Sequence, residues 1–392
     1  MRGGAVIRRG NFVVLDDILK KRLLHIESKG LLRKLRSSTY STSEYGDHKV
    51  IVGGEETDEP LTCFSCNDYM GLASNALVKQ AAIDAIERYG VGACASRLIT
   101  GNHSLYEELE KRIAEIYGTE ASLVFSSGYL ANIGGISALV DRHDMILADK
   151  YIHASSMDGI KLSGAKLYRF AHNDVAHCEE LLNEYRKLHK HCLIVVENVY
   201  GMDGDVAPLD DLIKVAKKYD SWVAVDAAHG FGMVEEARPD IYIGTLSKAV
   251  GSLGGYICAS KVTIEYIINK ARSFIYTTAL PPAIVAAATA AIDLYLAYKD
   301  VPLRLAKEFC QILGLRAPQS HIVSLIMRDS QSALDAERTL AKRGILAVAI
   351  RPPTVPTPRL RFVFTAAHKL IDIHRLCNVL RQDSILENSV LA

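Results

Sequence analysis

A single lysine lies among small residues in the stretch GTLSKAVGSLGG, Gly244 to Gly255. Lys248 follows the apolar run Ile241 to Thr245, and the glycines, serines and alanine around it offer little to balance its charge. Loss of solvation disfavours the charged form of an amine, so a lysine in this setting gives up its proton readily and can act as a nucleophile and a base. The spacing predicts a reactive amine at the end of a buried strand.

Other polar groups follow apolar runs in the same way. Asp226 ends the run that begins at Ser221, His229 comes three residues later, and His153 follows the run that ends at Asp149. A fourth apolar run is followed by two serines, a glycine and a tyrosine that open a helical pattern, namely Ser126, Ser127, Gly128 and Tyr129. Taken alone, each group has an ordinary structural explanation, because aspartates cap turns, serines cap helices and lone histidines are often packed polar residues.

Together these groups match the needs of pyridoxal 5′-phosphate (PLP). PLP needs a lysine amine to hold its aldehyde as a Schiff base, a carboxylate to keep its ring nitrogen protonated, and a seat for its phosphate. Lys248 would supply the amine and Asp226 the carboxylate, and the open N–H groups of a helix that begins near Ser127 suit a phosphate. The convergence favours one PLP site over four unrelated structural residues.

The elements that must position these groups alternate along the chain. The predicted strands cover 121–125, 144–149, 192–197, 221–226 and 241–245, and helical patterns such as the one over 209–219 separate them. Fully apolar strands that alternate with helices indicate an α/β fold with a mostly parallel sheet covered by helices. In such sheets ligands bind beyond the carboxyl ends of the strands, which is where the polar groups fall.

Three parts are expected along the chain. An amphipathic pattern from Asp17 to Arg36, broken at Gly30, predicts an N-terminal helical arm over residues 1–45. Residues 46–280 are expected to form the large PLP-binding domain, and residues 281–392 a smaller C-terminal α+β domain. The smaller domain is predicted to hold strands in HIVSLIM and RLRFVF and a helix around 330–343.

The composition is that of an ordinary globular chain. Of 392 residues, 49% are hydrophobic and 23% charged, and 46 lysines and arginines against 45 aspartates and glutamates give a net charge of +1. This balance gives no support to nucleic acid or an acidic membrane as the main partner. The run Ala283 to Ile292 is too short to span a bilayer, and the first residues lack the apolar core of a secretory signal. Cys63 and Cys66 lack a second ligand pair, so we expect no metal, reduced thiols and a cytoplasmic location.

With these residues in view, the chain resembles the α-oxoamine synthases, fold-type I PLP enzymes that condense an amino acid with an acyl thioester and release carbon dioxide. The resemblance runs from about Leu15 to Leu380. Its markers, in chain order, are SCNDYMGLASN, GVGACASRLITGNHSLYEELEKRIA, FSSGYLAN, DKYIHAS, ENVYGMDGDVAPL, VDAAHGFG, GTLSKAVGSLGGY, SFIYTTALPP and RPPTVPTPRLRFVFTAAH. Each motif alone is weak to moderate, whereas the whole set in this order is specific.

The resemblance implies a role for each group at the predicted sheet edge. Lys248 would carry the Schiff base, Asp226 would pair with the pyridinium nitrogen, and His153 would stack on the ring. His229 would contact the phenolic oxygen of PLP and help to position the acyl carbonyl. The phosphate would be held by residues on three segments, which are Ser127, Gly128, Tyr129, Thr245 and, from the neighbouring subunit, Thr277 and Thr278. A homodimer with shared sites is therefore implied.

Two arginines are implied for the substrates, the amino acid and the acyl thioester. Arg361 matches the family's arginine for the amino-acid carboxylate. On the predicted strand RLRFVF, the alternation turns Leu360 and Phe362 toward a core and leaves Arg361 on the other face, where its fork suits a carboxylate. Arg359 shares that face and fits a solvated edge arginine better.

The segment RPPTVP, Arg351 to Pro356, resembles the branch of the family that joins L-alanine to a pimeloyl thioester in biotin biosynthesis. Its prolines would present Arg351 rigidly near the mouth of the site, where a dicarboxylic acyl chain could be bound. A merely structural proline-rich turn is the alternative. Glycine with acetyl-coenzyme A is the second candidate substrate pair, that of a glycine C-acetyltransferase.

Two positions depart from the family pattern, which usually has a serine where Gly201 stands and an acidic residue where Ala227 stands. Other functions are also open. A non-catalytic partner subunit could keep this fold, but the presence of Lys248 argues against it. A decarboxylase or aldolase could use the same fold and cofactor, but the region of Arg361 and the segments HGFG and TALPP favour the synthase.

Overall fold

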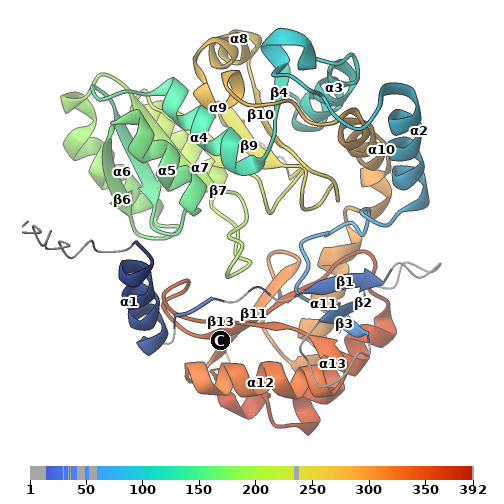
Figure 1. The fold of residues 1–392 in the computed structure, drawn as a ribbon. Helices are drawn as coiled ribbons and strands as arrows, with labels where there is room; N and C mark the ends of the chain where they lie inside the picture. Colours follow the sequence, from blue (N-terminus) through green and yellow to red (C-terminus); the bar gives the residue numbers. More distant parts are fainter. Residues whose placement is uncertain are drawn as a thin grey trace, which may run out of the picture.

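The computed structural model describes residues 15–29, 31–33, 35, 37–41, 49–52, 60–233 and 238–390. Figure 1 shows two bodies of secondary structure, one built around a seven-stranded sheet and the other around two four-stranded sheets. Among the described residues, no helix combines the length and the apolar character that crossing a bilayer requires.

The large sheet has the strand order β4-β10-β9-β8-β7-β5-β6. In that order the strands are Ala121–Phe125, Gly255–Ala259, Ile241–Thr245, Trp222–Asp226, Cys192–Glu197, Met145–Asp149 and Lys166–Phe170. Only β10 runs against its neighbours, β4 and β9, so the prediction of a mostly parallel sheet is confirmed. Strands β6 and β10 were not predicted, because β6 mixes charged and apolar residues at the sheet edge and β10 follows a glycine-rich turn.

Helices cover both faces of this sheet, as predicted. One face packs against α4 (Gly128–Leu139), α5 (Ala154–Ser163), α8 (Lys261–Lys270) and α9 (Arg272–Ile275). The other face packs against α2 (Ala76–Tyr89), α3 (Leu105–Tyr117), α6 (Val175–Tyr185), α7 (Leu209–Lys218) and α10 (Pro282–Tyr298). Within β8, Val223 and Val225 enter the second core and Ala224 the first. Burial on both faces explains why the central strands are apolar throughout.

The smaller body holds an antiparallel sheet in the order β13-β14-β11-β15. These strands are Val348–Ile350, Arg359–Val363, Ile322–Met327 and Ser389–Val390, and they pack with α11 (Val301–Leu313), α12 (Ser330–Lys342) and α13 (Leu370–Gln382). The two strands and the helix predicted here are confirmed. Short helical turns lie at Arg97–Gly101, Arg186–Leu188 and Leu386–Asn388.

A second small sheet joins distant parts of the chain in the order β1-β2-β3-β12. Its strands are Ser38–Ser41, Lys49–Val52, Leu61–Cys63 and Ile345–Leu346, and the main-chain N–H of Thr62 donates to Gly344 at 2.9 Å. Helix α10, in turn, packs on α2 and α3 of the large body. We therefore propose that the large domain runs from about residue 66 to 299, and that β1 to β3 belong with the C-terminal domain.

Helix α1 (Leu15–Ser28) is the described part of the predicted arm over residues 1–45. It buries none of its side chains, and Leu15 and Leu24 are 66% and 64% exposed. The described stretch 38–41 of the same arm is not helical, because it pairs with β2 as a strand.

Candidate active site

The amine of Lys248 lies just beyond the carboxyl end of β9. Its Nζ is 2.9 Å from Nε2 of His229, which follows β8. Burial lowers the pKa of Lys248, against the opposing effects of Asp226 and Glu197, and Arg361 lowers it further. A half-buried lysine that loses its proton readily can serve as a nucleophile and a base, as the sequence predicts.

His229 links Lys248 to a tyrosine that sequence reasoning did not single out. Its Nδ1 lies 2.5 Å from the hydroxyl of Tyr69, and both side chains are buried. Burial, followed by the positive charges of Lys248 and Arg361, holds the pKa of His229 well below its usual range. The ring is therefore neutral, with one nitrogen that donates and one that accepts a hydrogen bond.

Asp226 ends β8 and is 4% exposed. Its Oδ2 accepts a hydrogen bond from Nδ2 of Asn132 on α4 at 2.7 Å, and its Oδ1 accepts one from the main-chain N–H of Ala228 at 3.0 Å. The same Asn132 amide donates to Ser155 on α5 at 3.0 Å. These donors fix the carboxylate at the sheet edge.

Glu197 is a second carboxyl group at this edge, and it was not predicted. It ends β7 and is the register partner of Asp226 on β8. Burial and, after it, the nearby Asp226 carboxylate hold the pKa of Glu197 well above its usual range, which favours the protonated form of Glu197. The signal was present in the sequence, because Glu197 ends an apolar run just as Asp226 does.

His153 stands at the start of α5, where its Nδ1 accepts a hydrogen bond from the main-chain N–H of Ser155 at 3.2 Å. The partial desolvation of its ring lowers its pKa, and the charges of Asp226 and Lys248 act on it in opposite directions. The structure thus brings His153 within electrostatic reach of both residues.

The start of α4 lies against the end of β9. Ser127 caps the helix by accepting a hydrogen bond from the main-chain N–H of Leu130 at 3.2 Å, and Gly128 and Tyr129 supply the first main-chain N–H groups, which lack helical acceptors. A Cβ atom on Gly128 would lie 2.9 Å from Cβ of Thr245, so only glycine allows this approach. The hydroxyls of Thr245 and Ser247 are 2.7 Å apart beside it. Helix start and hydroxyls form one anion-binding corner.

Thr278 has an exposed side chain, and its main-chain carbonyl accepts a hydrogen bond from Oγ of Ser126 at 2.8 Å. Thr277, beside it, is half-buried. The contact places this segment next to the helix start, while its role toward a neighbouring subunit stays a prediction.

Arg361 reaches the site from β14 of the smaller domain and is 7% exposed. Its Nε donates to the carbonyl of Gly201 at 2.5 Å and its Nη2 to Oδ1 of Asn67 at 3.3 Å. The predicted alternation is confirmed, because Leu360 packs in the small-domain core and Val363 in the large one. Arg361 therefore faces the site.

The expectation for Arg359 was wrong. It is 2% exposed and forms an ion pair with Asp203, so it is no solvated edge residue. The sequence could not reveal this partner, which lies on a loop of the other domain.

Arg351 follows β13 and is half-exposed. Within the described part of the chain, its guanidinium makes no hydrogen bond or ion pair, so the structure does not join it to the other site residues by contact. Its role in binding the acyl chain stays a prediction.

Gly201 and His229 compete for one space. A Cβ atom on Gly201 would lie 2.2 Å from Nε2 of His229, so the imidazole fills the room in which relatives are expected to carry a serine. Ala227 is fully buried. The glycine thus permits the observed contact between His229 and Lys248.

His321 is another site residue that sequence reasoning missed. Its ring lies 4.0 Å from that of Tyr69, and burial, followed by the charge of Arg361, lowers its pKa to about 3. It precedes the predicted strand HIVSLIM, and only the fold brings it to the site.

These residues fit PLP. The donor set combines a half-buried amine, a fixed carboxylate and a glycine-lined anion corner, which are the three groups that the cofactor requires. Within the described residues, no cluster of three or more histidines, cysteines or acidic residues is placed to hold a metal ion.

Comparison with known proteins agrees with this chemistry. The family model for aminotransferase class I and II matches residues 59–380. The chain is 46% identical to a putative 8-amino-7-oxononanoate synthase of Acidiphilium cryptum, over 95% of this chain and 98% of the relative. It is 45% identical to 8-amino-7-oxononanoate synthase of Methylobacterium nodulans, over 94% and 97% of the two chains.

Solved structures point the same way. Serine palmitoyltransferase of Sphingomonas wittichii has a TM-score of 0.83 and 28% identity, over 94% of this chain and 96% of that one. The 8-amino-7-oxononanoate synthase of Francisella tularensis has a TM-score of 0.69 and 28% identity, over 83% and 98%. The chain belongs to the aminotransferase class I and II family and, within it, to the α-oxoamine synthases. It is a PLP-dependent acyltransferase of fold type I.

Proposed function

We propose that this enzyme joins L-alanine to a pimeloyl thioester, with release of carbon dioxide, and so forms 8-amino-7-oxononanoate for biotin biosynthesis. Relatives with this name, 43% to 46% identical and aligned over more than 90% of the chain, support the choice of substrates. The observation that carries the chemistry is the half-buried amine of Lys248, 2.9 Å from a neutral imidazole.

PLP supplies an electron-poor ring that stores the electron pair left on Cα when a proton departs. We propose that Lys248 holds the cofactor and then moves the Cα proton. Asp226 would face the ring nitrogen, His153 the ring, and the corner formed by Ser127, Gly128, Tyr129 and Thr245 the phosphate. The pKa of Lys248, lowered by burial, suits a group that accepts and returns a proton.

On the substrate side, Arg361 would bind the amino-acid carboxylate with the help of the Asn67 amide, to which it already donates. The neutral His229 would orient the acyl carbonyl, because its ring is held between Lys248 and Tyr69. Arg351 would bind the distal carboxylate of the pimeloyl chain. The substrate assay described below also compares coenzyme A with acyl carrier protein as the carrier of the pimeloyl group.

We further propose that the active enzyme is a homodimer in the cytoplasm. The exposed segment at Thr278 lies beside the anion corner, where a second subunit could reach it. None of the eight cysteines forms a disulfide, which suits a reducing compartment.

The decisive assay offers alternative substrate pairs to the purified, PLP-loaded protein. L-Alanine with pimeloyl-coenzyme A or pimeloyl acyl carrier protein should give the highest kcat/KM, with carbon dioxide as a product. Glycine with acetyl-coenzyme A and L-serine with palmitoyl-coenzyme A serve as the competing pairs. A preference for either competing pair would overturn the substrates while leaving the family intact.

A further inference from the structure

The two domains meet at the loop of residues 199–206, here called the bridging loop, which connects β7 to α7 (Figure 1). Three of its carbonyl groups accept hydrogen bonds from the smaller domain. Gly201 accepts from Nε of Arg361 at 2.5 Å, Met202 from Ser324 at 2.7 Å, and Gly204 from Ser320 at 2.7 Å. The position of the bridging loop therefore sets where the guanidinium of Arg361 is held.

On the large-domain side, the bridging loop is anchored by a histidine that no step of the reaction uses. Nε2 of His172 lies 2.6 Å from Oδ2 of Asp205, and Nδ1 of the same ring lies 3.0 Å from Oδ1 of Asp149. Asp149 is the fully buried last residue of β5. Asn173 adds a hydrogen bond to Oδ2 of Asp205 at 2.8 Å. The imidazole thus ties the bridging loop to the end of a central strand.

The charges make this tie an ionic one. A carboxylate can only accept hydrogen bonds, so an imidazole between two carboxylates binds both only when each nitrogen carries a proton. Burial lowers the pKa of His172, but the two carboxylates outweigh it and raise that pKa to about 9. Near neutral pH the ring is an imidazolium with two charge-assisted hydrogen bonds, which are the stronger kind.

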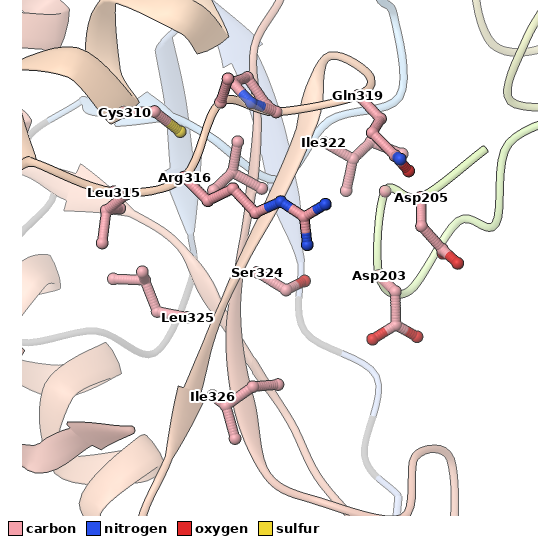
Figure 2. A pocket seen from close by; sticks show the side chains of 14 residues that line it. Asp203, Asp205, Cys310, Leu315, Arg316, Gln319, Ile322, Ser324, Leu325 and Ile326 are labelled. Carbon is pink, nitrogen blue, oxygen red and sulfur yellow. The ribbon is translucent and has the colours of Figure 1, made fainter. Parts of the chain in front are cut away.

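Two further polar contacts hold the bridging loop from the smaller domain: Arg359 forms an ion pair with Asp203, and Gln319 accepts a hydrogen bond from the main-chain N–H of Val206 at 3.0 Å. A cavity of about 230 Å³ separates Asp203 and Asp205 from Leu325 and Ile326 of β11, with Arg316 reaching into it (Figure 2). Val199 and Tyr200 at the start of the loop pack in the large-domain core, whereas the tip of the loop beside this cavity is held by its polar contacts.

We propose that His172 is a positioning residue for the amino-acid substrate. It acts through Asp205 and the bridging loop on the Gly201 carbonyl, and so on Arg361. The inference rests on the proposed function of Arg361 in binding the substrate carboxylate. His172 touches neither substrate nor cofactor.

The test compares His172→Gln with His143→Gln, a matched change of an exposed histidine before β5. For His172→Gln, KM for L-alanine should rise about tenfold, because a carboxylate clamp displaced by a fraction of an ångström loses its fit. KM for the acyl thioester and kcat should stay within about twofold of wild type. Hydrogen–deuterium exchange of residues 199–206 should accelerate without substrate, and His143→Gln should change none of these quantities. Asp205→Asn, which keeps the side-chain shape, should act in the same direction if His172→Gln folds poorly.

Equal rises in both KM values, or unchanged exchange in the bridging loop, would overturn the positioning role. Failure of the proposed function gives a different pattern. If Arg361→Gln leaves KM for L-alanine unchanged while His172→Gln still accelerates exchange, Arg361 does not bind the carboxylate. The proposal for His172 would fall with it, although its structural tie would stand.

Discussion

Two histidines at the carboxyl edge of one sheet differ in charge: His229 is neutral and His172 is a cation. His229 lies between Lys248 and Tyr69, and burial, followed by the charges of Lys248 and Arg361, holds its pKa well below the usual range. His172 stands between the carboxylates of Asp149 and Asp205, and its pKa is raised to about 9. Both rings are desolvated, so the neighbours decide the difference. The carboxyl edge of the sheet therefore has two parts. At His229 and Lys248 a proton can move between groups, whereas at His172 a positive charge is held between two carboxylates.

That division suits the work of each part. A neutral ring 2.9 Å from a lysine with a lowered pKa can pass or share a proton, whereas a permanent imidazolium cannot. A permanent imidazolium, on the other hand, holds two acidic segments together. The following predictions would break or sharpen this contrast, and they run from the largest expected effect to the smallest.

Lys248→Ala should remove the reactive amine at the carboxyl edge of the sheet. Turnover should fall by about a thousandfold or more, because neither the covalent hold on the cofactor nor the Cα proton transfer has another amine to use. The melting temperature should change little, since the amine lies at the sheet edge. Steady-state kinetics and thermal unfolding measure both, with the exposed Lys261→Ala as control. Near-normal turnover would refute the assigned role.

Arg361→Gln should separate amino-acid binding from acyl binding. KM for L-alanine should rise about 30-fold or more, the cost of losing a buried guanidinium–carboxylate pair. Arg351→Gln is the matched change in the acyl region, and it should raise KM for the pimeloyl thioester alone. If both variants alter the same KM, then Arg361 and Arg351 do not bind different substrates.

Gly201→Ser should weaken the contact between His229 and Lys248, although it introduces the residue expected in relatives. A Cβ atom 2.2 Å from Nε2 of His229 forces the ring away from Lys248. Loss of that hydrogen bond should cost about 0.5–1.5 kcal/mol, or roughly twofold to tenfold in kcat/KM. Gly201→Ala, which adds bulk without a hydroxyl, should give a similar loss. An increase in kcat/KM for the serine variant would mean that His229 has room to move without penalty.

The pH dependence of stability should differ in sign between the two histidines. His172 has a folded pKa of about 9, above its unfolded value, so its contribution is complete below about pH 6.5 and is lost as the pH rises through 9. His229 has a lowered folded pKa, so it costs stability as the pH falls below about 6.5. Thermal unfolding from pH 5.5 to 9.5 should show the advantage of wild type over His172→Gln shrinking toward alkaline pH. An advantage that does not depend on pH would mean that Asp149 and Asp205, with the adjoining Tyr151 and Tyr200 rings, do not stabilise a charged imidazole.

The parts of the fold that follow from local pattern could be predicted from the sequence. Strands buried on both faces are apolar throughout, so β4, β7 and β9 were found at their observed bounds. Short strands whose partners lie far away in the sequence carry no such pattern, and β3 pairs with β12 through partners such as Thr62 and Ile345. The domain to which β3 belongs depends on that pairing.

The site divides in the same way. Residues that end apolar strands, such as Asp226, could be found because parallel strands share one edge. Tyr69 and His321 reach the site from segments that no sequence pattern connects to it, and only the fold brings their rings into a tilted contact. Arg359 was misjudged because its charge is matched by Asp203, a residue distant in sequence.

The reversed strand β10 has a consequence for synthesis on the ribosome. β4 carries the start of α4, and β9 carries the loop to Lys248, yet the two strands do not touch; β10 lies between them and pairs with both. A nascent chain that has emerged only to residue 250 contains both halves of the proposed cofactor site without the strand that joins them. Loading of the cofactor must therefore wait until residue 259 has left the exit tunnel, and translation arrested before that point should yield chains that cannot retain it.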